Sequence, residues 1–436
     1  MRVRPRGTLC YIATGTTGAR HFLQLKVMRY GSDKRRKLLI IDLSAAGHHP
    51  TYIRRLLQSE LSTSADIVLA SRREMFSHTE IRPFQSTFTA HVIEAAPSLA
   101  ALYGNFGTVS VMRASWVIGS LYRKTYENLS KRMDIGFVVV PFLDDCLVGL
   151  ALTANAFGGT PWTAITMRTM FHFGAMQVTA PPLKFSRLRR YLFDRVLRQK
   201  SLAAMLSIDP TLAAFAKRQS DPSYKKIEYL PDPAARHEAL PSRQAARTQL
   251  GIPSDARVVL LYGEIAARKG VFALLDAAAD EACSRQLHVL LAGRYERADL
   301  MLEQPAYRTL MEQHRLHRVE GFVDDAGERT VLAATDCMWV GYTDFYLMSG
   351  VMVLAGRHSL PVIASREGLI GYWTRERDIG IAVNTRERSS VIAALNQVVR
   401  EPEQLARMGR NGINAFSEHE PAVLAQLVAK TYARCT

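Results

Sequence analysis

The chain has 436 residues, of which 48% are hydrophobic and 22% are charged. At about 150 residues per domain this length predicts two or three units, with two large α/β domains as the simplest case, and the apolar content excludes wholesale disorder. The five cysteines are scattered and never form CxxC, which argues against a disulfide framework and a structural zinc site. A reducing, cytoplasmic location is the expectation.

The net charge of +16 is unevenly distributed. Residues 1–37 hold ten Lys and Arg against one acid, a net +9, which leaves the rest of the chain near +7. We therefore expect residues 1–36 to form a disordered basic tail, or Met28 to be the true start. Neither aromatic interleaving nor a recognised module accompanies the charge, so no nucleic-acid partner is predicted. No apolar run is long enough for a signal peptide or a membrane span.

The N-terminal half alternates strand and helix patterns, which predicts βαβ units and a parallel sheet. Its first strand, KLLIIDLS (37–44), leads through AAGHHP into a helical pattern with Ile53, Leu56 and Leu57 on one face. Proline-rich residues 228–244 predict an interdomain linker, so the first domain covers 37–235. The other predicted strands of this domain are 65–71, 135–142, 162–168 and 202–209.

The alternation restarts after the linker and predicts a second Rossmann-like domain over 236–415. Six strands are expected in it, each an apolar run bounded by turn residues. They are RVVLLYG (257–263), LHVLLAG (287–293), VEGFV (319–323), DCMWVGY (336–342), PVIAS (361–365) and GIAV (380–383).

The stretch GEIAARKG (263–270) leaves the first of these strands through Gly263 and places Arg268 and Lys269 in the following turn. A strand, a glycine turn and a lysine at the start of a helix are typical of phosphate sites, because the first NH groups of a helix are unpaired and partly positive. The alternative is a solvated basic turn.

Four motifs in order resemble family 4 of the glycosyltransferases, retaining enzymes of the GT-B type, over most of residues 257–430. They are GEIAARKG, VEGFVDD (319–325), ATDCMWVGY (334–342) and LPVIASREGLIGYW (360–373). The resemblance implies two Rossmann-like domains facing across a cleft, with a C-terminal helix (416–436) crossing back to the first. It also implies metal-independent transfer of a sugar from a nucleotide sugar to a glycan or lipid-linked acceptor in cell-surface polysaccharide or glycolipid synthesis, without a cofactor.

The donor would be bound mainly by the second domain. Lys269 and Arg268 would stabilise the negative charge that develops on the departing diphosphate. Ser349 and Gly350 would hold the diphosphate through backbone NH groups at a helix start, with an ordinary N-cap as the alternative. The remaining donor-binding residues expected are Gly263, Val323, Glu367 and Gly368.

Two departures from the family pattern concern the donor. Glu264 stands where the family has an arginine, and the E-x7-E signature falls on Tyr346 and Leu354. The second glutamate normally binds the donor ribose; Asp344 and Glu367 are nearby acids that could replace it. The missing pair leaves open a non-catalytic scaffold, and the fold leaves open a nucleotide-sugar epimerase or hydrolase, but the pattern SGV (349–351) resembles a divergent branch and favours an active enzyme.

The acceptor side is expected in the first domain. Gly47 follows the first strand where GT-B enzymes bring the chain close to the acceptor, with a plain turn glycine as the alternative. His48 or His49 would contact the acceptor; adjacent histidines cannot face the same way, so no metal site is predicted. Asp144, in LDDCL (143–147), is a further candidate. Together with Asp145 it could form a metal or base pair, with a helix N-cap and an acid favourable to the helix dipole as the alternative.

Arg168 and His172 follow a predicted strand where the related enzymes carry a histidine near the donor sugar. His172 is therefore a candidate catalytic residue and Arg168 a candidate substrate contact, against the alternative of a core histidine.

Residues 182–200 contain seven Lys or Arg with apolar residues at helical spacing. Such a helix can lie on anionic lipid, which predicts peripheral contact with the cytoplasmic membrane face. The alternative is a surface helix whose apolar face packs on the core.

Overall fold

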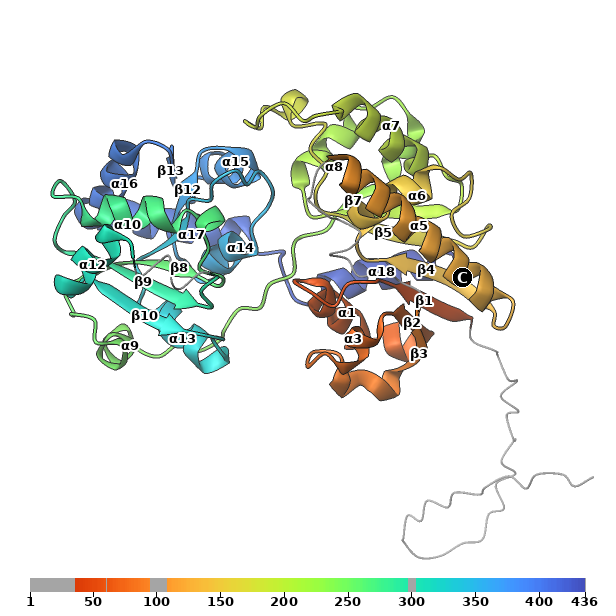
Figure 1. Cartoon of the computed structure of the whole chain (residues 1–436), viewed down its shortest axis with the longest axis horizontal. Coiled ribbons are helices and arrows are strands. Elements are labelled where there is room, and N and C mark those ends of the chain that lie inside the picture. The colour runs from red at the N-terminus through yellow and green to blue at the C-terminus, as the bar shows by residue number, and fades with distance from the viewer. Residues whose placement is uncertain (1–35, 60, 95–107, 297–302, 436) are drawn as a thin grey trace, which may run out of the picture. The chain divides into compact units, whose positions relative to one another are not determined.

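The computed structural model describes residues 36–59, 61–94, 108–296 and 303–435 (Figure 1). The predicted basic tail, apart from Arg36, lies outside the described residues. The described chain forms two parallel β-sheets, of seven and six strands, each accompanied by its own helices. The predicted fold class, two Rossmann-like α/β domains, is confirmed.

The first sheet has the strand order β3-β2-β1-β4-β5-β6-β7, with every neighbouring pair parallel. Its central strands are almost completely buried, as expected for a parallel sheet covered on both faces. The strands are β1 (Lys37–Ile41), β2 (Asp66–Ser71), β3 (Phe88–Val92), β4 (Ile135–Val140), β5 (Trp162–Thr166), β6 (Leu202–Ser207) and β7 (Ile227–Tyr229).

The two edge strands of this sheet, β3 and β7, were not predicted from the sequence. β3 contains exposed Thr89 and Ala90 and lacks the continuous apolar run that marks a buried strand. β7 has only three residues, and it includes the start of the segment 228–244 that was predicted to be a linker. That linker prediction is therefore wrong at its first residues, because pairing with β6 needs little local hydrophobic pattern.

The helices of the first domain begin with α1, whose buried Ile53, Leu56 and Leu57 form the predicted apolar face. The α-helices are α1 (His49–Leu57), α2 (Leu61–Ser64), α3 (Arg73–Ser77), α5 (Thr108–Ser130), α6 (Leu147–Ala151), α7 (Ser186–Leu197) and α8 (Pro210–Lys217). The 3-10 helices are η1 (Arg82–Thr87), η2 (Leu143–Asp145), η3 (Gly174–Met176) and η4 (Pro222–Lys226).

The second sheet has the order β10-β9-β8-β11-β12-β13, again with parallel neighbours. All six predicted strands are present, but β10 ends at Glu320 instead of continuing through Val323. Gly321 turns the chain with φ +95°, and Phe322 is 94% exposed. The strands are β8 (Arg257–Tyr262), β9 (Leu287–Gly293), β10 (Leu316–Glu320), β11 (Cys337–Val340), β12 (Val362–Ser365) and β13 (Gly380–Val383).

The last helix, α18 (Val423–Ala433), contacts α1 of the first domain, and its Tyr432 ring lies edge-on to Phe137 of β4 at 5.6 Å between centroids. None of the helices in the described part of the chain is long and apolar enough to cross a membrane. The other helices are α9 (Arg243–Leu250), η5 (Ala267–Lys269), α10 (Val271–Ala279), α12 (Pro305–Glu312), α13 (Asp325–Ala334), α14 (Gly350–Arg357), α15 (Gly368–Glu376), α16 (Arg388–Arg400) and α17 (Pro402–Ala415).

Both sheets reverse their strand order beside their first strand. The reversal falls between β1 and β4 in the first sheet and between β8 and β11 in the second. In open α/β sheets, ligands bind outside the carboxyl ends of the strands at such a switch point. A ligand-binding site is therefore expected in the loops that follow β1, β4, β8 and β11.

Candidate functional site

The loop after β8 folds a lysine back over the end of its own strand. Nζ of Lys269 donates a hydrogen bond to the carbonyl oxygen of Tyr262 at 2.8 Å and lies 5.7 Å from the ring centroid of Tyr342. Gly263 has φ +93°, and a Cβ placed on it would lie 3.0 Å from this Nζ. Glycine at this position therefore both permits the turn and leaves room for the ammonium group.

Burial, followed by the nearby Arg268 guanidinium, lowers the pKa of Lys269 to about 8, with Glu264 opposing the shift. Only 7% of the lysine is exposed. Burial costs the charged ammonium group more than its contacts with the Tyr262 carbonyl and the Tyr342 ring return, so an incoming anion would stabilise it. Arg268 itself pairs with Glu264 at 2.6 Å, so a phosphate near Arg268 would compete with that carboxylate.

The turn that contains Arg268 and Lys269 is hydrogen-bonded to β11 and to the loop that follows it. The indole NH of Trp339 donates to the carbonyl of Lys269 at 2.9 Å, and the NH of Thr343 donates to the carbonyl of Arg268 at 2.9 Å. Gly270 has φ +70°, and a Cβ there would lie 2.0 Å from the carbonyl oxygen of Gly341. The two loops at the second switch point thus form one wall.

Ser349 stands at the N-cap position of α14 but does not cap it. Its hydroxyl donates instead to the Tyr342 hydroxyl at 3.1 Å, and α14 begins without a side-chain cap. The nearest atom to a Cβ placed on Gly350 is Oδ2 of Asp232, at 3.8 Å. Through Tyr342, the structure brings Ser349 into the same cluster as Lys269.

The other expected donor residues lie apart from this cluster. Glu367 precedes α15 and has both carboxylate oxygens 3.4 Å from Arg386, which also pairs with Asp344 at 2.5 Å. The two acids that could replace the missing glutamate are thus already paired with one arginine. The NH of Gly368 donates to the carbonyl of Thr179 at 2.7 Å. Val323 packs partly buried in the loop before α13.

At the first switch point, His49 is held by a buried carboxylate. Its Nδ1 lies 2.8 and 3.0 Å from the two oxygens of Asp42, which directly follows β1 and is 1% exposed. The imidazole stacks on Phe142 with 3.6 Å between ring centroids, and its Nε2 lies 3.6 Å from Oδ2 of Asp145. Asp42 also accepts the NH of Ser44 at 3.0 Å, which fixes the carboxylate.

Burial disfavours the charged form of His49, but the Asp42 carboxylate outweighs it with help from Asp145, so the pKa of His49 is raised above 6.5. Asp145 in turn pairs with Arg168. The predicted acceptor-side residues His49 and Arg168 are therefore linked through an aspartate. Gly47 and His48 are exposed in the loop before α1, and the His48 side chain does not cap that helix.

The Asp144 carboxylate lies at the carboxyl end of β5. It accepts hydrogen bonds from the Thr166 hydroxyl at 3.0 Å, the Met167 NH at 2.7 Å and the Arg168 NH at 3.2 Å. The N-cap alternative does not hold, because the N-cap of α6 is Cys146. A cavity of about 220 Å³ adjoins these residues. Its polar lining is Asp144, Asp145, Arg168, Thr169 and Arg189, and its apolar lining is Val111, Leu147, Met170, Phe171, Leu183 and Phe193.

His172 lies in the core of the first domain. It is fully buried, with Nε2 2.9 Å from Oδ2 of Asp209 and 3.0 Å from the Thr211 hydroxyl. Asp209 caps α8, so the histidine supports the start of that helix. This is the core histidine of the alternative interpretation, and it is out of reach of a substrate in this conformation.

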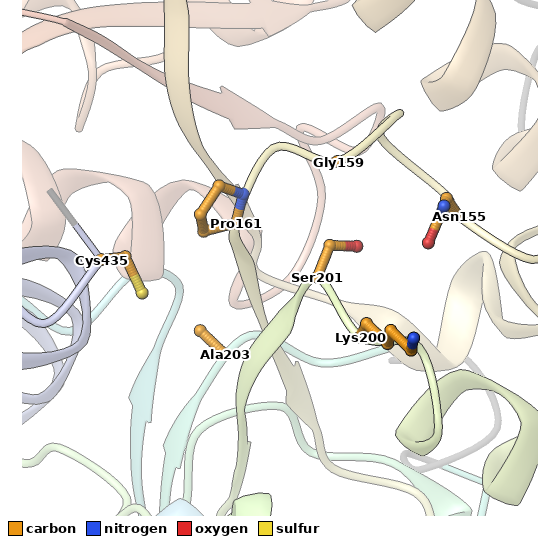
Figure 2. A pocket seen from close by; sticks show the side chains of 7 residues that line it. All are labelled: Asn155, Gly159, Pro161, Lys200, Ser201, Ala203 and Cys435. Atoms are coloured by element: carbon orange, nitrogen blue, oxygen red, sulfur yellow. The ribbon is translucent and has the colours of Figure 1, made fainter.

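A larger cavity, of about 390 Å³, lies at the amino ends of β5 and β6, whereas His49 follows the carboxyl end of β1. Figure 2 shows the residues that line this cavity. Its side chains are spread around the cavity and do not converge on one point. It is lined by Asn155, Gly159, Pro161, Lys200, Ser201, Ala203 and Cys435. Within the described residues no group of three or more His, Cys, Asp or Glu could hold a metal ion.

The sequence patterns do not single out Asp42 or Tyr342, and they indicate Asp145 only as the neighbour of Asp144, not as the partner of His49. Asp42 and Tyr342 each follow an apolar strand closely, which is the available signal for a residue at a carboxyl edge. The pairing of Asp145 with His49 carries no local signal, because it depends on β1 and β4 being neighbours.

No protein-family model and no curated protein sequence match this chain. Solved structures do. Sucrose-phosphate synthase from Thermosynechococcus elongatus is 16% identical, with 92% of this chain and 99% of that one covered and a TM-score of 0.63. Anabaena HepE in complex with UDP is 15% identical, with 91% and 100% covered and a TM-score of 0.61. A glycosyltransferase from Rickettsia africae is 9% identical, with 92% and 98% covered and a TM-score of 0.60.

Identities this low show a shared fold and nothing finer. The similarity runs along more than nine-tenths of the chain and includes both Rossmann-like domains. The chain therefore has the GT-B fold.

Proposed function

We propose that this protein is a glycosyltransferase that takes a sugar from a nucleotide-sugar donor. The observation that carries the proposal is Lys269, a nearly buried lysine with a lowered pKa at the switch point of the second sheet. The uncapped start of α14 lies in the same cluster, through Ser349 and Tyr342. Among the similar structures, HepE was solved with UDP and the Rickettsia africae protein is called a glycosyltransferase.

The chemistry requires a fixed positive charge. When the bond between the sugar and the nucleoside diphosphate breaks, negative charge grows on the departing phosphate, and a preorganised cation stabilises that charge more than the ground state. Lys269 would supply the charge, and the NH groups at the start of α14 would add their dipole. The four sequence motifs support the finer proposal of a metal-independent, retaining reaction in cell-surface polysaccharide or glycolipid synthesis.

The acceptor would bind in the 220 Å³ cavity of the first domain. That cavity combines ionic residues with an apolar wall, which suits a glycan carrying an apolar or lipid portion. Beside it, α7 and the residue before it expose Phe185 (58%), Leu188 (40%) and Tyr191 (53%) next to Lys184 and Arg187. These exposed apolar residues favour peripheral contact with an anionic membrane over a helix packed fully on the core.

The membrane contact is tested by flotation with phosphatidylglycerol-containing vesicles. We expect the protein to float with the vesicles and the variant Phe185→Ser, Lys184→Gln, Arg187→Gln to remain in the pellet fraction. Equal flotation of the two proteins would remove α7 as the membrane contact, and a wild-type protein that does not float would remove the membrane proposal. Neither outcome bears on the transferase proposal.

One observation favours the alternative that the protein is a non-catalytic scaffold with the same fold. Asp344 and Glu367, the acids nearest to the missing signature, are both paired with Arg386 and so are not poised for a ribose hydroxyl. An epimerase or hydrolase differs from both in its products, so analysis of the sugar released with and without an acceptor separates it from a transferase.

The first experiment is a thermal-shift screen against UDP, GDP, ADP and UDP-glucose. A nucleotide that binds only the folded protein adds about 2.7 kcal/mol of stability at 100 times its Kd, and so raises Tm. We expect one nucleotide class to raise Tm, Lys269→Ala to lose the shift, and Lys217→Ala, an exposed lysine of the first domain, to keep it. No shift with any nucleotide would favour the scaffold.

A further inference from the structure

Ser349 has the backbone conformation of a helix-capping residue, but its side chain does not cap. Its φ of −119° and ψ of 121° are extended, as in ordinary N-cap residues, yet among the described residues no side chain caps α14. Ser242, in the same position of α9, shows the ordinary arrangement, in which the hydroxyl oxygen accepts the NH of Ala245 at 3.2 Å. The Ser349 hydroxyl instead donates to the Tyr342 hydroxyl at 3.1 Å.

The first NH groups of α14 are open as a result. The Ser349 carbonyl accepts the NH of Met352 at 3.0 Å and the NH of Val353 at 3.3 Å. The NH groups of Gly350 and Val351 come before these, and no carbonyl of the helix is available to them. A serine hydroxyl can donate and accept at the same time, so the bond to the tyrosine does not exhaust it. The direction in which the serine side chain points is what leaves the helix uncapped.

Tyr342 is held firmly enough to direct this serine. It is 4% exposed, its NH donates to the carbonyl of Val340 at 2.9 Å, and its ring meets Phe345 edge-on with 5.4 Å between centroids. Burial raises the pKa of Tyr342 to about 12, so the hydroxyl is uncharged at neutral pH. The ring of the same tyrosine has its centroid 5.7 Å from Nζ of Lys269. One residue therefore contacts both parts of the proposed diphosphate site.

We propose that Tyr342 keeps the start of α14 open for the donor diphosphate by turning the Ser349 hydroxyl away from it. The inference rests on the proposed transferase function and adds the residue that prepares the diphosphate site. Tyr342 is a positioning residue, because its hydroxyl acts on the ligand through Ser349.

Two observations besides the helix start indicate an anionic ligand. The Lys269 ammonium group is only 7% exposed and lies beside the same tyrosine ring. A carboxylate of the chain itself already lies near the helix start, with Oδ2 of Asp232 3.8 Å from a Cβ placed on Gly350. The other oxygen of Asp232 accepts the Tyr52 hydroxyl at 2.7 Å, which holds this negative charge near the first turn of α14. A diphosphate carries more charge than one carboxylate and would gain more from the same NH groups.

The open helix start can be tested without a nucleotide. In Tyr342→Phe the ring stays and the hydroxyl is lost, so the buried Ser349 hydroxyl loses its partner, and we expect it to turn and cap α14. Hydrogen exchange of the full chain, followed by mass spectrometry on a peptide that contains 349–353, should then slow about fivefold. Exchange should return to the wild-type rate when Ser349→Ala is added. Unchanged or faster exchange in Tyr342→Phe would overturn the inference.

The binding test uses the nucleoside diphosphate, UDP, GDP or ADP, that raises Tm in the thermal-shift screen. Tyr342→Phe should raise its Kd about fivefold, because the new cap must be displaced before the diphosphate binds. The double variant Tyr342→Phe, Ser349→Ala should bind within about twofold of wild type, so that the second substitution rescues the first. Ser349→Ala alone should also bind like wild type. Titration calorimetry on the four proteins measures these values.

Ser242→Ala is the matched control, because it removes a real cap from another helix of the same domain. It should lower Tm without ligand and leave the nucleotide Kd unchanged. Tyr342→Phe should behave in the opposite way, with an equal or higher Tm and a weaker Kd. A tyrosine that only supports the fold would lower Tm when replaced, and Ser349→Ala would not rescue it.

The outcomes separate the two levels of the proposal. If no nucleotide raises Tm in wild type, the transferase proposal fails and the inference fails with it. If the nucleotide binds wild type and Tyr342→Phe equally well, the inference alone is overturned. If Ser349→Ala alone binds as weakly as Tyr342→Phe, the serine hydroxyl itself contacts the diphosphate, and the inference is overturned while the donor site stands.

Discussion

The two Rossmann-like domains share a topology, yet they place opposite chemistry at their switch points. Beside β1 and β4 the loops gather carboxylates around one histidine, whereas beside β8 and β11 they gather a lysine, an arginine and aromatic rings. The same strand reversal therefore fixes where a site can form. The residues that follow each strand decide which charge the site receives.

Burial acts on both central residues, but the pKa shifts have opposite directions. Burial lowers the pKa of Lys269 to about 8, and the Arg268 guanidinium acts in the same direction. His49 has two carboxylates, which outweigh burial and raise its pKa. The lysine site thus gains from an added anion, while the histidine site already contains its anions.

The largest expected effect comes from removing the lysine. Lys269→Met should lower the rate of nucleoside diphosphate release by about 10²–10³-fold, the cost of losing one preorganised stabilising group. Its Tm without ligand should stay equal or rise, because a buried charge is replaced by an apolar side chain. His49→Gln should keep the nucleotide-dependent Tm shift. Equal loss of nucleotide binding in both variants would contradict the division of roles.

Substitution of two glycines whose φ lies in the left-handed region tests how closely the loops after β8 and β11 pack. Gly270→Ala should lower the free energy of unfolding by more than about 2 kcal/mol, because backbone strain adds to the 2.0 Å approach to Gly341. Gly47→Ala, with φ +60° and no atom within 4 Å of its added Cβ, should cost only the strain of about 1 kcal/mol. Urea unfolding measures both, and similar values would show that the wall at the second site is not rigid.

The pH dependence of nucleotide binding should report Lys269. A bound diphosphate favours the ammonium form, so above pH 8 the free protein must take up a proton to bind. UDP affinity should therefore be flat just below pH 8 and fall by up to about tenfold per unit above it. Titration calorimetry in buffers of different ionisation enthalpy would detect the proton, and Lys269→Met should show neither effect.

The smallest expected effects are on stability, and they have opposite signs in the two domains. Because the pKa of His49 is raised in the folded state, His49 stabilises the fold below pH 6.5. This contribution is lost as the pH rises through the pKa of the folded state. Because the pKa of Lys269 is lowered in the folded state, the charged lysine destabilises the fold at neutral pH. This cost is relieved as the pH rises from about 8 to 10.5. Tm differences of about 1–3 °C are expected, for Asp42→Asn near pH 6 and for Lys269→Met near pH 7. Parallel pH curves for the two variants would contradict the comparison.

The sequence predicted the second domain better than the first. Strands such as LHVLLAG are continuous apolar runs and are completely buried, so pattern and structure agree. β3 shows no such run, because an edge strand needs to bury little. The expectation that His48 and His49 face different ways is met, since His49 binds Asp42 while His48 is exposed.

The site geometry depended on information that local patterns do not contain. Lys269 was recognised from its motif, but its return onto the Tyr262 carbonyl follows from the turns at Gly263 and Gly270. Asp145 reaches His49 only because β4 lies beside β1, almost a hundred residues later in the chain. Residue type and spacing could suggest which groups react; the strand order decides which of them meet.

The position of α18 has a consequence for biosynthesis. Residues 423–433 lie against α1, and Tyr432 packs on Phe137 of the first sheet. A ribosome therefore has to make almost the whole polypeptide before the earliest-made sheet receives this cover, and until then apolar surface near Phe137 stays open to chaperones. A nascent chain stalled in the second domain would hold an incomplete first domain, even though every strand of that sheet had already been synthesised.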